Sequence, residues 1–411
     1  MWRIAVGVAL VLAIAAAACG TDSARLRGTP VVWTRDTYYC RGPSLVKVDP
    51  NTLKILAGRQ LKLPDSASTF TNSPNPSLGV VDGTDHGRLV FVDPQGMRRL
   101  GALELGGWLD AAATIAWPRP RTLVALDIES DAHRVGLTKV VVVDPVGRRV
   151  VRQLRFSWWA ALAHGTTRSG RTAILLVSWT HLTTPRLVVV DADGSIRRRR
   201  IPGFAAGLGF DRIGETRRFP AMAVDPGTER AYVLLEHEPV AVVDLRTLRL
   251  WYRHLRLPAP RRDDAGSPHD TGTDNPTHGP QREAAWIGEG RLALAGFDSW
   301  TDHRGERDAG IGLDVIDTGR WSLATVRPGT FTFIPGTSQV VALGSGSLIV
   351  FGKGKLAYKV LDPHGSATAA GRLLVATRRG RLFRVLDPAT GRQVGLAPQK
   401  RVLAVGAGYC G

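Results

Sequence analysis

The sequence predicts an all-β protein, a β-propeller of eight four-stranded blades, with seven blades as the alternative count. Three observations lead to this fold class. A short phrase of β-branched and aliphatic residues ending in Asp recurs along the chain, and an apolar segment precedes each copy. Successive copies lie mostly about 44 to 53 residues apart, with two gaps near 70. Self-similarity at this period is typical of small sheets stacked radially around an axis.

The recurring phrase is clearest in the first half of the chain. Leu45–Pro50, Leu89–Pro94 and Val140–Pro145 each run from aliphatic residues into Asp-Pro. Weaker copies end at four further aspartates, which are Asp191, Asp244, Asp317 and Asp387. Asp and Pro favour tight turns, because the carboxylate accepts a hydrogen bond from a following amide and Pro presets φ. We therefore interpret each phrase as the third strand of a blade, strand C, with Asp opening the turn to strand D.

The segment before each phrase is almost entirely apolar, as expected for a second strand, B, that is covered on both faces. Eight such segments occur, at residues 31–33, 78–81, 123–126, 173–177, 231–235, 292–295, 340–343 and 373–376. Residues 348–351 supply an eighth strand C that has lost its Asp, which accounts for one long gap. An inserted loop at 256–283, dense in Pro, Gly, Asp and His, accounts for the other.

The two ends of the chain are predicted to meet. Residues 402–406 have no strand B after them, so we expect them to form strand A of the first blade and to close the ring. Cys40 and Cys410 would then lie close together. In an exported protein such a pair indicates a disulfide, with two unpaired buried thiols as the alternative.

The N-terminus reads as an export signal. A short basic start precedes an apolar run of signal-peptide length, so residues 1–19 are predicted to be a signal peptide. Its end, residues 16–19, resembles the lipobox of bacterial lipoproteins, which implies that Cys19 carries lipid; ordinary signal cleavage is the alternative. Residues 20–29 would be a tether and 30–411 a single propeller domain. The expected location is the extracytoplasmic side of the cell membrane, or outside the cell if Cys19 is not lipidated.

The net charge of +18 is carried almost entirely by Arg. Many arginines directly follow the Asp phrase, where the outermost strand of each blade is expected, and charge on an edge strand discourages pairing between sheets. A solvated basic belt is the simple interpretation, and attraction to anionic lipid or envelope polymer is the functional one. Nucleic acid is not an expected partner, because the chain carries an export signal and no nucleic-acid-binding motif.

One segment carries a family resemblance. Residues 372–394 contain an aliphatic strand, a Gly turn, a second strand ending in Leu-Asp and an Ala-Thr-Gly turn. This pattern resembles a repeat of the PQQ-like and YVTN-type β-propeller superfamily, and residues 47–56 match it as well. The superfamily includes quinoprotein dehydrogenases, lactonases and an eight-bladed lipoprotein scaffold. The resemblance therefore implies the fold rather than one activity.

Polar and aromatic residues gather in the predicted B–C loops, which share one rim of the ring with the D–A connections. The candidate binding residues are His86, Asp131, His133, Trp179, His181, His237, Trp300 and His303. Imidazoles and carboxylates on one rim could hold a metal or a polar ligand, or act as acid and base. No His pair has metal-ligand spacing, so we predict a binding rim without metal or cofactor.

Two functions remain open from the sequence. The favoured one is a membrane-anchored binding or scaffold protein of the cell envelope, because no compact catalytic motif is present. The alternative is a propeller enzyme, a lactonase-like hydrolase or quinoprotein-like dehydrogenase, with its site on the rim. The expected partner is an envelope protein or polar ligand at the rim, and the protein is expected to be a monomer.

Overall fold

The computed structural model describes most of the strands of the chain, and every structural statement below concerns these residues. They are 31–34, 44–47, 49, 54–56, 58, 60–64, 67–83, 87–105, 110–130, 135–210, 215–259, 277–302, 305–334, 339–344, 346–361, 367–370, 373–378, 382–387 and 392–398. This part of the chain is built from strands, and it contains no helix long and apolar enough to cross a membrane.

The strands form consecutive antiparallel groups, called blades and numbered in chain order. Blade 1 has three described strands, β1 (Val31–Thr34), β2 (Ser44–Lys47) and β3 (Leu61–Lys62). Blade 2 contains β4 (Ala67–Asn72), β5 (Gly79–Gly83), β6 (Arg88–Asp93) and β7 (Arg98–Glu104). Blade 3 contains β8 (Asp110–Arg119), β9 (Thr122–Ser130), β10 (Val135–Asp144) and β11 (Arg149–Ser157). Blade 4 contains β12 (Trp159–Thr166), β13 (Thr172–Ser178), β14 (Arg186–Val190) and β15 (Ile196–Arg200).

The second half of the chain repeats this arrangement. Blade 5 contains β18 (Ala221–Asp225), β19 (Arg230–Leu234), β20 (Val240–Asp244) and β21 (Leu250–Arg253). Blade 6 contains β22 (Thr277–Gly288), β23 (Arg291–Asp302), β25 (Leu313–Asp317) and β26 (Ser322–Arg327). Blade 7 contains β27 (Phe331–Ile334), β28 (Val340–Gly344), β29 (Ser347–Gly352) and β30 (Lys355–Leu361). Blade 8 contains β31 (Ala367–Ala370), β32 (Leu373–Arg378), β33 (Leu382–Leu386) and β34 (Gln393–Pro398).

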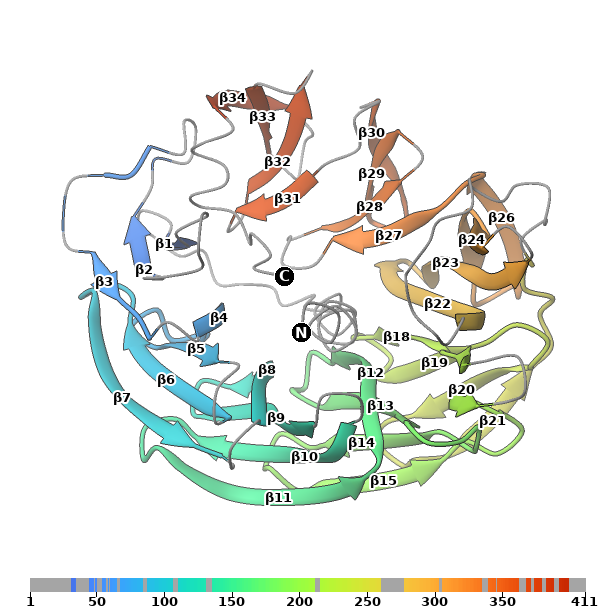
Figure 1. The fold of residues 1–411 in the computed structure, drawn as a ribbon, viewed down its shortest axis with the longest axis horizontal. Helices are drawn as coiled ribbons and strands as arrows, with labels where there is room; N and C mark the ends of the chain where they lie inside the picture. Colours follow the sequence, from blue (N-terminus) through green and yellow to red (C-terminus); the bar gives the residue numbers. More distant parts are fainter. Residues whose placement is uncertain are drawn as a thin grey trace.

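The blades stand side by side around a central axis, with the first strand of each blade innermost (Figure 1). A layer of buried side chains lies between each pair of neighbours. Between blades 4 and 5, for example, Leu175, Val233 and Val243 pack with no exposed surface. Similar layers join each of the other consecutive pairs from blade 1 to blade 8. Burial of aliphatic side chains between sheets therefore holds the ring together.

The strand assignment made from the sequence is confirmed. Each of the eight apolar segments overlaps the strand before a strand C, from β1 in blade 1 to β32 in blade 8. The eight expected C strands are β2, β6, β10, β14, β20, β25, β29 and β33. The predicted closing strand, residues 402–406, lies outside the described residues, as do Cys40 and Cys410. The total blade count, the closure and the disulfide therefore stay predictions.

The aspartates open the turns as predicted. Asp144 Oδ1 accepts hydrogen bonds from the backbone amides of Val146 and Gly147, at 3.1 and 3.0 Å. Asp93, Asp244 and Asp317 make the same pair of bonds to the residues two and three positions later. The bond from the Gly147 amide is the main cause of a lowered pKa at Asp144. These carboxylates are therefore ionised and directed inward, onto the turn backbone.

The sequence was wrong about the end of the inserted loop. Residues 277–283, expected to lie in the loop, form the first half of β22. Polar residues, Gly279 and Pro280 made this stretch resemble a loop, but its backbone pairs on both sides, with β23 and with an additional strand, β17 (Glu215–Arg218). Residues 277–283 therefore form a strand because neighbouring strands pair with them, and not because they have an apolar pattern of their own. Residues 260–276 lie outside the described part of the chain.

Candidate functional site

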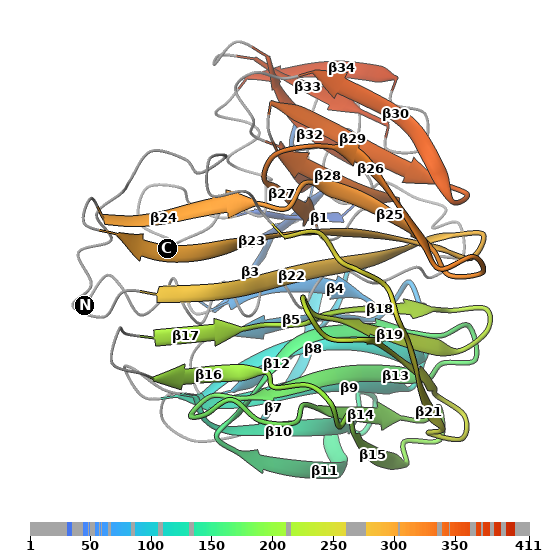
Figure 2. The same ribbon diagram turned by 90° about the vertical axis from the view of Figure 1, so that its right-hand side faces the viewer.

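A sheet rises from one rim of the ring, above blades 4 to 6, and is continuous with the sheets of blades 4 and 6. It consists of β16 (Gly207–Phe210), β17, the first half of β22, the second half of β23, and β24 (Gly305–Gly310), and we call it the raised sheet. Figure 2 shows it at the left, on the rim of the B–C loops and D–A connections. The opposite rim carries the Asp turns and the A–B turns, and we call it the Asp-turn rim.

The raised sheet is joined to blades 4 and 6 by backbone pairing. Gly207 of β16 pairs with Ser178 at the end of β13 in blade 4. β16 pairs with β17, and β17 pairs in parallel with β22 of blade 6, at Glu215–Thr277. The β16–β17 hairpin, which belongs to the connection between blades 4 and 5, thus spans from blade 4 to blade 6. Loops of an ordinary blade do not need such pairing, so the sheet is an addition to the ring.

Two glycines permit the close approach of its strands. Gly279 has a φ of +118°, and a Cβ there would lie 2.1 Å from the Arg217 carbonyl oxygen of β17. Gly296 has a φ of +142°, and its Cβ would lie 2.2 Å from the Gln281 carbonyl oxygen. Only glycine fits at these two positions, because any other residue would have an unfavourable φ and a Cβ that clashes with a backbone oxygen.

A buried arginine anchors the raised sheet to the top of blade 5. The Arg282 side chain has no exposed surface, and its guanidinium lies 2.6 Å from Glu236 Oε2 and 2.6 Å from Asp298 Oδ1. It also donates to the Phe297 carbonyl at 2.9 Å. Glu236 comes from the B–C turn of blade 5, whereas Asp298 comes from β23. Two blades and the raised sheet therefore share one charge network.

The network extends to the surface through one predicted residue, His237. Its Nε2 lies 2.9 Å from Glu236 Oε1, and 82% of its side chain is exposed. Burial raises the pKa of Glu236, and the neighbouring carboxylate of Asp298 raises it further. Because Glu236 holds one nitrogen of the His237 imidazole, the other nitrogen is available to a ligand or a proton. The buried part of the network, between Arg282 and the two carboxylates, has the arrangement of a structural ion pair that holds two elements together.

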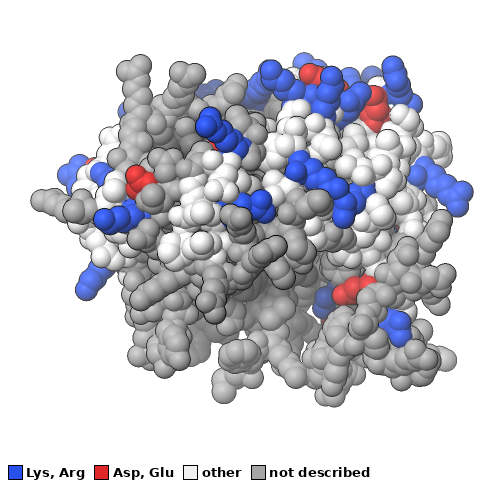
Figure 3. All heavy atoms as spheres, turned by 90° about the horizontal axis from the view of Figure 1, so that it is seen from above, with Lys and Arg blue, Asp and Glu red and all other residues white. Residues whose placement is uncertain are grey.

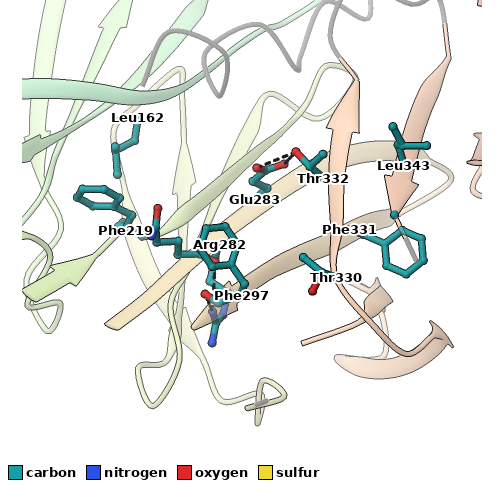
Figure 4. A pocket seen from close by; sticks show the side chains of 12 residues that line it. Leu162, Phe219, Arg282, Glu283, Phe297, Thr330, Phe331, Thr332 and Leu343 are labelled. Carbon is teal, nitrogen blue, oxygen red and sulfur yellow. Dashed lines mark hydrogen bonds between the residues drawn. The ribbon is translucent and has the colours of Figure 1, made fainter. Parts of the chain in front are cut away.

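A cavity of about 410 Å³ lies beside the raised sheet, among the inner strands of blades 4 to 7. Leu162, Phe219, Phe297 and Phe331 give it mainly apolar walls (Figure 4). Glu283 and Thr332 point toward one another across it and are hydrogen-bonded at 3.0 Å. Glu283 also accepts from the Phe333 amide at 3.0 Å, and burial raises its pKa. The carboxylate thus links β22 to β27 across two blades.

The predicted rim residues divide into two groups. His86, Asp131, His133 and His303 lie outside the described residues, as does Cys19. Trp179, His181, His237 and Trp300 are described and lie on the expected rim. Trp179 stacks on Phe219, with ring centroids 5.6 Å apart, and packs between the cores of neighbouring blades. His181 is exposed and hydrogen-bonds to Thr180 Oγ1 at 2.9 Å. In the part of the chain that the structure describes, no cluster of His, Cys, Asp and Glu could hold a metal ion.

Sequence reasoning missed two exposed aromatic residues on the same rim. Phe210, at the tip of β16, is 53% exposed, and Trp158, between blades 3 and 4, is 45% exposed. Trp158 has a φ of +61°, which is rare for a bulky residue. Its carbonyl accepts a hydrogen bond from the Trp179 amide at 2.8 Å, so the backbone is held in place. Strained backbone supporting an exposed aromatic side chain is typical of functional positions.

Comparison with known proteins identifies the fold. No protein-family model matches the chain, and no curated protein matches it in sequence. Among solved structures, dihydro-heme d1 dehydrogenase NirN, in complex with DHE, has a TM-score of 0.52 at 13% identity, covering 93% of this chain and 76% of NirN. The chain is a β-propeller.

Two further similar structures are named as propellers. The Dos1 propeller has a TM-score of 0.46 at 11% identity and covers 86% of this chain and 85% of its own. The β-propeller domain of Cps50 (Swd1) from Myceliophteria thermophila has a TM-score of 0.40 at 12% identity, with coverages of 79% and 95%. Identities this low support the fold alone. The function of this propeller therefore has to be inferred from the residues on its own rim.

Proposed function

We propose that this propeller is a membrane-anchored binding or scaffold protein of the cell envelope, and that its partner protein docks on the rim of the raised sheet. The observation that carries the proposal is the raised sheet itself. It adds backbone pairing between blades 4 and 6 and a buried charge network with blade 5 at one rim, which the ring does not need for its own packing. Such an addition gives a rigid platform, and rigid platforms lower the cost of binding.

The side chains on this platform suit a protein partner. Phe210 and Trp158 are exposed there, with His181 and His237 as polar neighbours on the same rim. Aromatic residues are over-represented among the residues that dominate binding energy, because they bury a large area at a small entropy cost. His237 supplies an exposed polar group at the edge, held by Glu236. We therefore expect Phe210 and Trp158 to contribute most of the affinity.

Photo-crosslinking in intact cells tests the docking rim. A photoreactive amino acid at His181, on the rim, is expected to give one adduct of defined mass. The same amino acid at Val146, which is 64% exposed in an Asp turn, or at Leu356, which is 48% exposed on β30, should give none. Replacing Phe210 and Trp158 with Ala should reduce the His181 adduct on the order of tenfold or more. Adducts of the same kind from Val146 and Leu356 would contradict the proposal.

Membrane anchoring has its own test. Cys19→Ala is expected to release the protein from membranes, because the lipid attached at Cys19 is the proposed anchor and one acyl chain alone already gives measurable membrane affinity. Fractionation of cells at high salt, which removes electrostatic attachment, measures the release. A Cys40→Ala variant serves as the control for the loss of a cysteine and should stay with the membrane. Equal retention of Cys19→Ala and the unmodified protein would refute the lipid anchor.

A further inference from the structure

The first described strand begins at the Asp-turn rim, not at the rim of the raised sheet. Val31 pairs with Lys47, the last residue of β2, a strand C. The Lys47 ammonium donates to the Gln95 carbonyl at 3.1 Å, and Gln95 belongs to the Asp turn of blade 2. The chain therefore enters the propeller beside the Asp turns. Eleven residues, 20–30, separate Val31 from Cys19. Fully extended they span about 40 Å at most.

The Asp-turn rim presents positive charge outward. Its carboxylates are directed into the turns, and Asp93 is only 7% exposed. The arginines that pair with them stand outside, with side-chain exposures of 71% for Arg98, 75% for Arg149 and 63% for Arg246. Further exposed arginines on this rim include Arg99, Arg121, Arg168 and Arg249. Figure 3 shows several Lys and Arg residues along its upper edge, with a few Asp and Glu residues among them, on the side of the blades that lie at the top of Figure 1.

The arginines of this rim attract a membrane only if the rim lies close to it. The Debye length at physiological salt is about 8 Å, so arginines on the far rim are screened from a membrane that the near rim touches. A basic side chain near an anionic leaflet raises membrane affinity roughly fivefold. The point of chain entry and the outward arginines therefore identify the same rim.

We propose that the Asp-turn rim faces the membrane and that its exposed arginines contact anionic lipid headgroups. The raised sheet then points away from the bilayer, toward the partner. This inference rests on the proposed membrane location and adds the orientation of the propeller and the class of lipid that it contacts.

Vesicle binding by the Cys19→Ala full chain tests the rim without the anchor. The protein is expected to bind vesicles that contain phosphatidylglycerol, to bind vesicles of phosphatidylcholine alone far more weakly, and to dissociate as salt is raised. Changing Arg99, Arg121, Arg168 and Arg249 to Glu should weaken binding to the anionic vesicles on the order of 100-fold or more.

The matched control has the same net charge. Four exposed arginines lie near the ends of outer strands, toward the opposite rim, and these are Arg155, Arg200, Arg253 and Arg256. Their replacement by Glu should leave binding within a few-fold of the unmodified chain. An equal loss of vesicle affinity in both variants would show that binding depends on the net charge of the protein and not on the position of the arginines. That result would overturn the proposal. Absence of binding to phosphatidylglycerol vesicles would overturn it as well.

The orientation is measured on the lipid-modified chain. A fluorescent amino acid at Val146, on the Asp-turn rim, should transfer energy efficiently to a labelled headgroup lipid, and one at Phe210 should not. Stronger transfer from Phe210 would reverse the orientation and overturn the inference. The two proposals can fail separately. If Cys19→Ala stays on membranes, the lipid anchor is refuted. If the variant with four Glu residues on the Asp-turn rim still loses vesicle binding, contact between that rim and lipid remains supported.

Discussion

Replacing Arg282 with Met is expected to destabilise the propeller by about 3 to 5 kcal/mol. The guanidinium has no exposed surface and lies 2.6 Å from a carboxylate oxygen of Glu236 and of Asp298. Met fills a similar volume, so the loss comes from the charge. Two carboxylates would remain close together in a partly buried site without a cation. Urea unfolding of the full chain at neutral pH measures the loss.

The pH dependence of that loss identifies its cause. Burial and Asp298 already raise the pKa of Glu236, and removal of Arg282 raises it further. A carboxyl group whose pKa is higher in the folded state than in the unfolded chain binds its proton more tightly when folded. Its cost is therefore fully present above the folded pKa and disappears as the pH falls toward the unfolded value, about 4.3 for Glu. The destabilisation should shrink on acidification.

Two controls accompany this variant. Arg218 lies at the edge of the raised sheet and pairs with Glu238 at 3.2 Å, but both side chains are partly exposed, so Arg218→Met should cost at most about 1 kcal/mol. The triple variant Arg282→Met, Glu236→Gln, Asp298→Asn removes every charge of the network and should recover most of the stability. An Arg282→Met variant as stable as the unmodified chain would show that the network does not hold the raised sheet.

The parts of the fold that the sequence predicted depend on local chemistry. Asp144 bonds to amides two and three residues later, so the turn can be read from neighbouring residues alone. The B strands could be found because their burial on both faces makes them apolar throughout, as in β13. Repetition of these local signals around the ring then made the fold class evident.

The raised sheet depends on contacts between distant segments, and the sequence gives no local sign of them. Glu215 and Thr216 of β17 pair with Thr277 and His278, and a short polar strand of this kind has no alternating pattern. Arg282 could be noticed only as a charge before an apolar run, because Glu236 lies 46 residues earlier. The sequence pointed to this rim through its histidines, whereas the residues that shape the raised sheet there are an arginine and two glycines.

Gly279→Ala is the second variant with a large expected effect, and it separates the raised sheet from the ring. At Gly279 the φ of +118° and a Cβ position 2.1 Å from the Arg217 carbonyl oxygen exclude any side chain. The substitution should force β17 away from β22, at a local cost of about 3 kcal/mol. That cost corresponds to amide hydrogen exchange in β17 about 100-fold faster, whereas strands such as β13 in the blade cores should keep their protection.

Gly203→Ala is the matched control, because Gly203 lies in the connection between blades 4 and 5 that contains β17 and also has a positive φ, +84°. Its Cβ would meet nothing closer than the Tyr252 hydroxyl at 4.0 Å, so only the backbone conformation opposes the change, at about 1 kcal/mol. In Gly203→Ala, amide exchange in β17 and the adduct formed from His181 should both be unchanged. In Gly279→Ala, exchange in β17 should become faster and the adduct should decrease. If Gly279→Ala loosens β17 while the adduct persists, the partner binds elsewhere. If exchange in β17 stays slow, the pairing of β17 with β22 does not hold the raised sheet.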